Sequence, residues 1–319
     1  MHYTITHTTR FVYQSPIAES VMEVRMQPRS EGFQWCQHFE LHTTPRASVL
    51  AYRDGSDNAV HHFNIPGRHR ELVVTARSTV DMQQAPAVPD ALSVEAWQTI
   101  DQLEQTGEFW DYRHQSRFAV FTPRIHALAS TLDVDRTSDP LTVLNRVTAG
   151  IYERFEYLPK TTNVDSAIDE AFDAGGGVCQ DFAHIMIALV RTTGIPCRYV
   201  SGYLPRDAGR HDRSEPAATH AWVEAWLPEL GWTGFDPTNG GLARDRHVRV
   251  AIGRDYSDVP PTRGVFKGEA SSELQVAVEV RQTDSTPAPT VLGEPVWAVR
   301  EIAAPPTRPD RQQQEQMQQ

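Results

Sequence analysis

The apolar residues change their spacing once along the chain, and this change predicts a β-rich part followed by a mixed part. In residues 1–82 apolar side chains alternate with polar ones, as at Tyr3 and Ile5, which is typical of half-buried β-strands. From about residue 90 they recur at helical spacing, as at Trp97 and Ile100. The two patterns predict an α+β fold. An antiparallel domain, β-sandwich-like or a half-barrel, precedes a core of helices and strands.

Proline-rich segments and the change of spacing set the expected boundaries. The expected parts are an N-terminal β-domain (1–82), a linker and helical connection (83–122), a core (123–265), a C-terminal strand that returns to the β-domain (266–282) and a mostly disordered tail (283–319). Helices are predicted over 90–105, 123–132, 139–155 and 166–172 and from Cys179 onward, and core strands near 197–204, 219–227, 231–236 and 247–252.

Cys179 closely follows three glycines, Gly175 to Gly177, and precedes apolar residues at helical spacing. A helix that begins at or near Cys179 would place the thiol at the positive end of the helix dipole, which favours the thiolate. The glycines permit a sharp turn and would leave room for a substrate to approach. A buried cysteine that packs as a small apolar side chain is the alternative, so the assignment depends on the partners that the chain supplies.

A cysteine nucleophile needs a general base within hydrogen-bonding reach and a third group that orients the base. His220 begins an alternating stretch typical of a strand, and Asp236 ends a second stretch before Pro237. A turn-like break at 228–231 separates them, so an antiparallel hairpin would bring His220 and Asp236 to the same end. The residues Cys179, His220 and Asp236 therefore form a candidate triad, although histidine in a strand and aspartate before proline also occur in purely structural roles.

Four segments around these residues resemble, in the same order, the core of the transglutaminase-like superfamily, most closely its bacterial stand-alone branch. They are Val178–Ala183, Gly194–Tyr203, Thr219–Glu224 and Gly231–Asn239. The resemblance implies a papain-like catalytic core in which the helix that bears the cysteine packs on an antiparallel sheet. It implies Cys179 as nucleophile, His220 as base and Asp236 as the group that orients His220. Residues 3–13 and 26–29 also resemble the N-terminal β-region of these bacterial proteins.

The expected chemistry is acyl transfer through a thioester, because a thiolate attacks carbonyl carbon and water or an amine then releases the acyl group. We expect hydrolysis of a peptide, isopeptide or amide bond, with a peptide or protein as substrate. A true transglutaminase, which transfers an amine to glutamine, needs the same three residues. A non-catalytic binding or scaffold protein with a vestigial triad is the third hypothesis. No cofactor is expected: the chain has no EF-hand loop, and the calcium dependence of animal transglutaminases is not carried over.

Four further residues are candidates for the oxyanion hole or the substrate pocket. The backbone N–H of Cys179 is a natural oxyanion donor at a helix start. The resemblance implies a second donor from an aromatic or polar side chain upstream, for which Tyr157 is the first candidate. Gln180 and His184 lie on one face of the cysteine helix, and Trp222 could flank a substrate channel. Packing or a structural hydrogen bond in the core is the alternative for Tyr157, His184 and Trp222.

Composition argues against several other functions. The formal net charge of −11 disfavours a broad nucleic-acid interface, and no segment approaches the roughly 20 apolar residues of a membrane span. The first residues lack a secretory-signal pattern, so we expect a cytoplasmic protein. Cys36, Cys179 and Cys197 do not form a disulfide framework, and neither they nor the 13 histidines show a zinc-binding spacing. The oligomeric state is not indicated.

Overall fold

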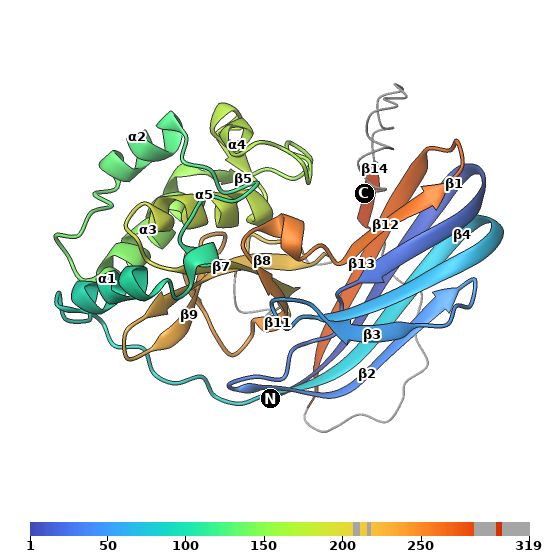
Figure 1. The fold of residues 1–319 in the computed structure, drawn as a ribbon, viewed down its shortest axis with the longest axis horizontal. Helices are drawn as coiled ribbons and strands as arrows, with labels where there is room; N and C mark the ends of the chain where they lie inside the picture. The colour runs from blue at the N-terminus through green and yellow to red at the C-terminus, as the bar shows by residue number, and fades with distance from the viewer. Residues whose placement is uncertain (207–210, 216–217, 284–297, 302–319) are drawn as a thin grey trace.

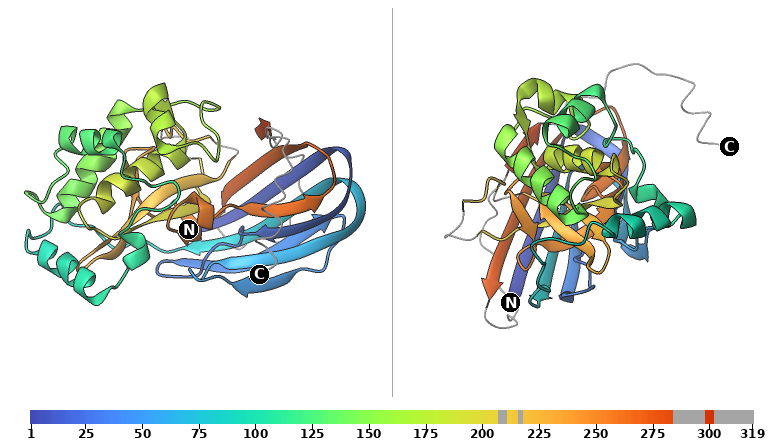
Figure 2. Two further views of the ribbon diagram at one scale, coloured as in Figure 1. Left: turned by 45° about the horizontal axis from the view of Figure 1, so that its top comes forward. Right: turned by 90° about the vertical axis from the view of Figure 1, so that its left-hand side faces the viewer.

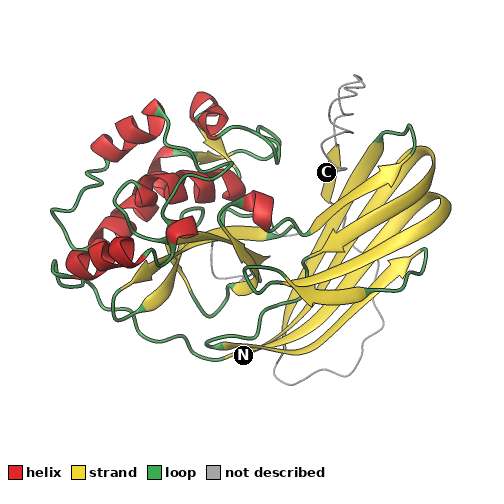
Figure 3. Cartoon of the chain, viewed as in Figure 1, coloured by secondary structure: helices red, strands yellow, loops and turns green. Residues whose placement is uncertain are grey.

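The computed structural model describes residues 1–206, 211–215, 218–283 and 298–301. One half of the described chain consists of helices that cover a small antiparallel sheet, and the other half is built on a larger antiparallel sheet (Figures 1 and 3). The left view in Figure 2 shows the same division from another side. The predicted α+β class is confirmed.

Two long strands, β1 (His2–Val24) and β4 (Ala59–Met82), form the centre of the larger sheet. They pair antiparallel along most of their length, with register shifts between Val12 and Glu19 that locally bend and twist the ribbon. Within the described residues the sheet has seven strands and its hydrogen bonding is continuous. The sandwich-like domain expected for 1–82 is therefore one bent sheet. Its shorter strands each pair with part of a long strand: β2 (Gln34–Thr44) and β3 (Leu50–Arg53) with β4, and β12 (Thr262–Lys267) and β13 (Ser272–Thr283) with β1.

Side chains from both sides of the bend pack into one buried cluster. Phe63 of β4 lies on one side of the bend, Leu72 and Val74 lie on the other, and Ile17 of β1 lies within it. Each is almost completely buried, and burial of such a side chain stabilises the fold by about 1.5–3 kcal/mol. The alternating pattern of residues 1–82 thus supplies a core of its own.

The chain returns to the larger sheet after the mixed core. The predicted strand 266–282 corresponds to β13, which pairs with the first half of β1. The return begins earlier than the expected boundary at 265, because β12 already pairs with the second half of β1. A short strand, β14 (Ala298–Glu301), pairs with β13 inside the tail expected to be disordered. The rest of that tail beyond Thr283 lies outside the described residues.

The helices begin and end close to their predicted positions. Asp139 caps α3, as expected, and its side chain accepts hydrogen bonds from the N–H groups of Leu141 and Thr142. The first helix starts later than the predicted residue 90. There, the N–H of Leu92 donates to the same Asp139 carboxylate at 2.9 Å instead of joining a helix. The helices are α1 (Ala96–Thr106), η1 (Trp110–Tyr112), α2 (Pro123–Thr131), α3 (Pro140–Arg154), α4 (Ile168–Ala174), α5 (Cys179–Arg191) and η2 (Tyr256–Asp258).

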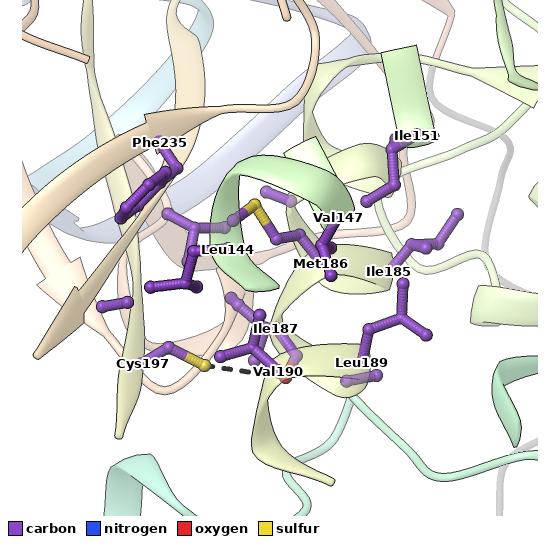
Figure 4. Close-up of a cluster of buried hydrophobic side chains, with 14 of the residues drawn as sticks. Leu144, Val147, Ile151, Ile185, Met186, Ile187, Leu189, Val190, Cys197 and Phe235 are labelled. Atoms are coloured by element: carbon purple, nitrogen blue, oxygen red, sulfur yellow. Dashed lines mark hydrogen bonds between the residues drawn. The ribbon is translucent and has the colours of Figure 1, made fainter. Parts of the chain in front are cut away.

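Helix α5 forms the centre of the mixed half. Every residue from Gln180 to Arg191 is buried, as expected for a helix whose apolar side chains point in all directions. Figure 4 shows Met186 and its neighbours on α5 packed against Leu144 and Val147 of α3 and against Phe235 of the smaller sheet. That sheet has the order β10 (Gly241–Ala243), β9 (Gly231–Asp236), β8 (His220–Leu227), β7 (Cys197–Tyr203) and β11 (Val248–Gly253).

The two halves meet at β11, the edge strand of the smaller sheet. Gln34 and Asn58, both from the larger sheet, use their side-chain amides to bond the β11 backbone. Gln34 donates to the carbonyl of Arg249 at 2.8 Å and accepts from its N–H at 2.7 Å. Asn58 does the same at Ile252, at 2.8 Å in both directions. The larger sheet therefore covers an edge that would otherwise expose unpaired backbone groups. The same bonds fix the position of β11.

Candidate active site

Cys179 is the first residue of α5 and is half-buried. Asp181, at the third helical position, accepts the N–H of Val178 at 2.8 Å and the Thr162 hydroxyl at 2.6 Å. The first of these bonds is one half of a capping box, which ends the chain's extended conformation at Val178. The predicted helix start at Cys179 is confirmed, so the thiol lies at the positive end of the helix dipole.

Each of the three glycines before Cys179 has a structural reason in the local backbone. Gly175 ends α4 in the left-handed conformation, with φ of 67°. Gly176 and Gly177 form a short parallel strand, β6, beside β5 (Glu156–Tyr157). A Cβ atom at Gly176 would collide with the Glu156 carbonyl, and one at Gly177 would press on the Asp181 carboxylate. The expectation that Gly176 and Gly177 clear space for a substrate is therefore wrong, because backbone and cap atoms occupy that space.

The hairpin of β8 and β9 brings His220 and Asp236 together, as predicted. His220 begins β8 and Asp236 ends β9, and Nε2 of His220 lies 2.8 Å from Oδ2 of Asp236. Both side chains are at most 2% exposed. A buried imidazole in direct contact with a buried carboxylate forms a strong charge-assisted hydrogen bond.

Asp236 is held by donors on both carboxylate oxygens. Its Oδ1 accepts the backbone N–H groups of Thr238 and Asn239 at 3.0 and 3.2 Å. Its Oδ2 accepts the Asn239 side-chain amide at 2.7 Å and Nε2 of His247 at 3.0 Å, in addition to His220. Thr238 and Asn239 both belong to the turn after β9. This turn therefore fixes the position of the carboxylate independently of His220.

The electrostatics of the pair favour an imidazolium beside a carboxylate. Burial lowers the pKa of His220, but the Asp236 carboxylate and the Cys179 thiol outweigh it and raise that pKa to about 10. Burial also opposes ionisation of Asp236, yet His220 and His247 hold its pKa well below the usual range. Since Nε2 of His220 is bonded to Asp236, Nδ1 is the nitrogen available to the thiol. Nδ1 is buried and has no other partner among the described residues.

His247 is a part of this site that sequence reasoning missed. It lies just before β11, so its ring reaches Asp236 from a segment outside the β8–β9 hairpin. Its Nδ1 accepts the N–H of Arg244 at 3.2 Å, so the proton of the neutral ring is on Nε2 and points at Asp236. Burial lowers the pKa of His247, with Asp236 opposing the shift. No spacing rule relates His247 to Asp236, because only the order of strands in the sheet brings them together.

The nitrogens of His220 and His247 and one oxygen of Asp236 all lie within 4.8 Å of one another, close enough to consider a metal ion. The hydrogen bonds do not suit one. A metal at Nε2 of His247 would move the ring proton to Nδ1, where it would face the N–H of Arg244. It would also displace the proton that His220 holds against Asp236. The hydrogen bonds of both imidazoles need the ring protons that a metal ion would displace, so these residues do not fit a metal site.

Tyr157 and Gln180 lie near Cys179, and both make hydrogen bonds to neighbouring loops. Tyr157 pairs with Gly177 in the short parallel ladder, and its hydroxyl accepts the N–H of Glu215 at 3.2 Å. Gln180 donates its side-chain amide to the carbonyl of Val164 at 3.0 Å. Tyr157 remains a prediction as the second oxyanion donor, and the contact of Gln180 is a structural one between α5 and the loop before α4.

His184 and Trp222 are buried. His184 stacks between Phe118 and Tyr199 and accepts the N–H of Tyr256 at 3.2 Å. Burial lowers its pKa to about 4, so it is neutral. Trp222 is 1% exposed and sits edge-on to His247, with ring centroids 5.1 Å apart. Both side chains have the core contacts that were the alternative to a place in the pocket, and Trp222 shields the imidazoles from one side.

A cavity of about 330 Å³ adjoins the Asp236 side of the site, and Cys179 is not among the residues that line it. Asp212 and Arg246, which form an ion pair at 2.6 Å, contribute to its wall. The neighbouring Arg213 donates its N–H to the Asn239 side chain at 2.8 Å. The lining residues are Leu204, His211, Asp212, Asp236, Asn239, Gly241, Leu242, Arg246 and His247.

Comparison with known families and sequences matches both halves of the chain. The family model described as the transglutaminase-like superfamily matches residues 128–237, and that of the bacterial transglutaminase-like N-terminal region matches residues 3–81. An uncharacterized protein of Mycobacterium leprae is 30% identical over 277 residues, which is 86% of this chain and 97% of that protein. An uncharacterized protein of Mycobacterium tuberculosis is 31% identical over 290 residues, 87% of this chain and 92% of that protein.

Two further matches come from a solved structure and from a named enzyme. A crystal structure from Cytophaga hutchinsonii, described as that of a candidate cysteine protease, has a TM-score of 0.67 at 21% identity. The match covers 94% of this chain and 98% of that one, and it concerns the fold alone. A protein-glutamine gamma-glutamyltransferase of Pseudomonas aeruginosa is 36% identical over 121 residues, which is 36% of this chain and 18% of that protein.

Proposed function

Because this chain belongs to the transglutaminase-like superfamily, we propose that it is a cysteine-dependent acyl-transfer enzyme that hydrolyses peptide, isopeptide or amide bonds. The observation that carries the proposal is the buried His220–Asp236 hydrogen bond of 2.8 Å, with the half-buried thiol of Cys179 next to His220 at a helix start. This arrangement supplies a nucleophile, a proton carrier and the group that orients the carrier.

The proposed reaction starts from the thiolate of Cys179 and the imidazolium of His220. The sulfur attacks the carbonyl carbon, and the negative charge that develops on oxygen is stabilised by the Cys179 N–H, with Tyr157 as the proposed second donor. His220 gives its proton to the leaving amine as the C–N bond breaks, which leaves a thioester. The neutral His220 then takes a proton from water, the hydroxide attacks the thioester, and the acid product leaves as the thiolate returns.

Asp236 has two tasks in this scheme. It orients the imidazole so that Nδ1 faces the sulfur, and it stabilises the positive charge each time His220 is protonated. Since the turn residues Thr238 and Asn239 already fix the carboxylate, little reorganisation is needed during the proton transfers. A peptide or protein remains the proposed substrate and the cytoplasm the proposed location.

Amine transfer is the second candidate. The named Pseudomonas relative favours it, although the match covers only about a third of this chain. An amine would replace water in the last step and would need no change in Cys179, His220 or Asp236. A non-catalytic role with the same three residues in place is the remaining alternative.

One incubation separates the three functions. The full-length protein is mixed with glutamine-containing and isopeptide-linked peptides and a fluorescent primary amine, and mass spectrometry follows the products. Ammonia release or chain cleavage without amine incorporation is the expected result. Incorporation of the amine would replace hydrolysis by transglutamination, and no product at all would favour a scaffold. Cys179→Ala must abolish the reaction, and Cys36→Ala, the matched control, must leave it intact.

A further inference from the structure

Asp236 is shared by two imidazoles, and the reaction just proposed uses only one of them. His220 and His247 both direct Nε2 at the same oxygen, Oδ2, at 2.8 and 3.0 Å. The two rings come from different strand ends, and their centroids are 6.0 Å apart. The second imidazole therefore acts on the reaction through the carboxylate.

The backbone fixes the direction in which His247 acts. The N–H of Arg244 occupies Nδ1 of His247 at 3.2 Å, and the N–H of His247 donates to the Arg244 carbonyl at 2.8 Å. This reciprocal pair holds the ring in the tautomer with its proton on Nε2. The positive end of the N–H dipole consequently points at Oδ2 of Asp236.

We propose that His247 is a positioning residue that weakens the hold of Asp236 on the His220 proton by sharing the same carboxylate oxygen. This inference rests on the proposed function. His247 is not needed to place the carboxylate, because the turn donors Thr238 and Asn239 already bind both of its oxygens. Its contribution is to draw negative charge away from His220, so that the imidazolium gives up its proton more readily to a leaving group.

The charged and titratable groups around His247 come from several elements. Asp236 and His220 face its Nε2, and Arg246 is the neighbouring cation. Arg246 is bonded to Asp212 at 2.6 Å, which partly offsets its charge. On another side lies the uncharged Trp222 ring. Asp236 is thus the only carboxylate among the described residues that bonds the His247 side chain directly.

The test follows alkylation of Cys179 by iodoacetamide against pH, with peptide mapping to separate the three cysteines. In the wild type the rate should rise a second time near pH 10, when the imidazolium loses its proton. His247→Leu removes the N–H donor, and we expect this second rise to move up by about one pH unit. His247→Gln keeps an N–H donor and should stay close to the wild type.

His211→Gln is the matched control, because His211 lines the same cavity but is not among the groups bonded to Asp236. His211→Gln should leave the second rise in the alkylation rate at the same pH as in the wild type. An unchanged profile in His247→Leu, or a move to lower pH, would overturn the proposal. So would an equal shift in His247→Leu and His247→Gln.

A measurement on the unaltered protein keeps the proposal testable if His247→Leu does not fold. Nitrogen-15 NMR of the imidazoles should show His247 neutral at pH 7, with the proton on Nε2. A proton on Nδ1, or a charged ring, would overturn the proposal. Alkylation and NMR both work without turnover, so a failure of the proposed enzyme activity is distinguishable from a failure of the role of His247.

Discussion

His220 and His184 are both buried histidines of the mixed half, yet their protonation differs. His220 is at most 3% exposed and bonds Asp236 directly, and its pKa is raised to about 10. His184 is equally buried, but it lies between Phe118 and Tyr199 and accepts a backbone N–H, and burial lowers its pKa to about 4. Burial alone favours the neutral imidazole, whereas direct contact with a buried carboxylate can keep a buried imidazole charged, as at His220. His247, the second ring on Asp236, has a lowered pKa because burial outweighs the same carboxylate there.

The comparison shows why a histidine in a motif does not predict a function by itself. His184 is on the cysteine helix, only five positions after Cys179, while His220 is far away in sequence. The residue that is close in sequence has aromatic neighbours and a backbone N–H as its bonding partner, and the distant one is bonded to the carboxylate. The partner of the ring decides whether it can carry a proton in a reaction.

The largest effect is expected from His220→Ala, which removes the proposed proton carrier. We expect turnover to fall by about 10⁴-fold. The preference of iodoacetamide for Cys179 over Cys36 and Cys197 should also become much smaller, because the thiolate loses its counter-ion. Burial raises the pKa of the Cys36 and Cys197 thiols to about 11, so both should label slowly in the folded wild type. Equal labelling of all three cysteines in the wild type would contradict the assignment of Cys179.

Asp236→Asn tests the origin of the difference between the two histidines. Without the carboxylate, burial should dominate at His220 as it does at His184, so the His220 pKa should fall. The second rise in Cys179 alkylation should then move to lower pH, opposite to the direction expected for His247→Leu. We expect turnover to fall by less than in His220→Ala, because only orientation and charge stabilisation are lost. An unchanged alkylation profile would show that Asp236 does not control the proton.

The smallest effect is on stability, and it concerns His184. Its folded pKa of about 4 lies below its ordinary value of 6.5, so its contribution to stability is complete above pH 6.5 and is lost as the pH falls towards 4. His220 has the opposite sign: its contribution is complete below pH 6.5 and is lost as the pH rises through about 10. In His184→Gln, urea unfolding should show a shallower acid slope, by up to about 1.4 kcal/mol per pH unit.

The alkaline side of the stability profile is the control for His184→Gln. His220 is intact in both proteins, so the slope of the unfolding free energy against pH should be the same there. His7 is also buried, and burial lowers its pKa to about 3, so part of the acid slope should remain. An acid slope equal to that of the wild type would mean that His184 does not titrate as its surroundings require.

Much of the fold follows from local patterns. The patterns place the helices α1 to α5 and the strands β7, β8, β9 and β11 of the smaller sheet, and Asp139 with Pro140 marks the start of α3. The earlier return of the chain at β12 and the single bent sheet did not follow from these patterns, because both depend on long-range pairing along β1. Register shifts within a strand also leave no clear sign in a hydrophobic pattern.

The residues of the candidate site also divide into those that the sequence could predict and one that it could not. Cys179, His220 and Asp236 stand in recognisable local settings: a helix start, the beginning of a strand and the end of the next. Their meeting could be predicted because a hairpin joins the last two. His247 could not be, since it lies just before β11, which pairs with β7, and it reaches Asp236 only through the fold of the sheet.

The sequence by itself determined the residue types, the helix that begins at Cys179 and the hairpin that carries His220 and Asp236, because these depend on neighbours a few positions apart. The tertiary structure alone decided which buried histidine meets a carboxylate, what fills the space beside Gly176 and Gly177, and that a second imidazole shares Asp236. Those outcomes depend on contacts between distant segments, and the pKa of a buried group follows from such contacts rather than from its neighbours in the chain.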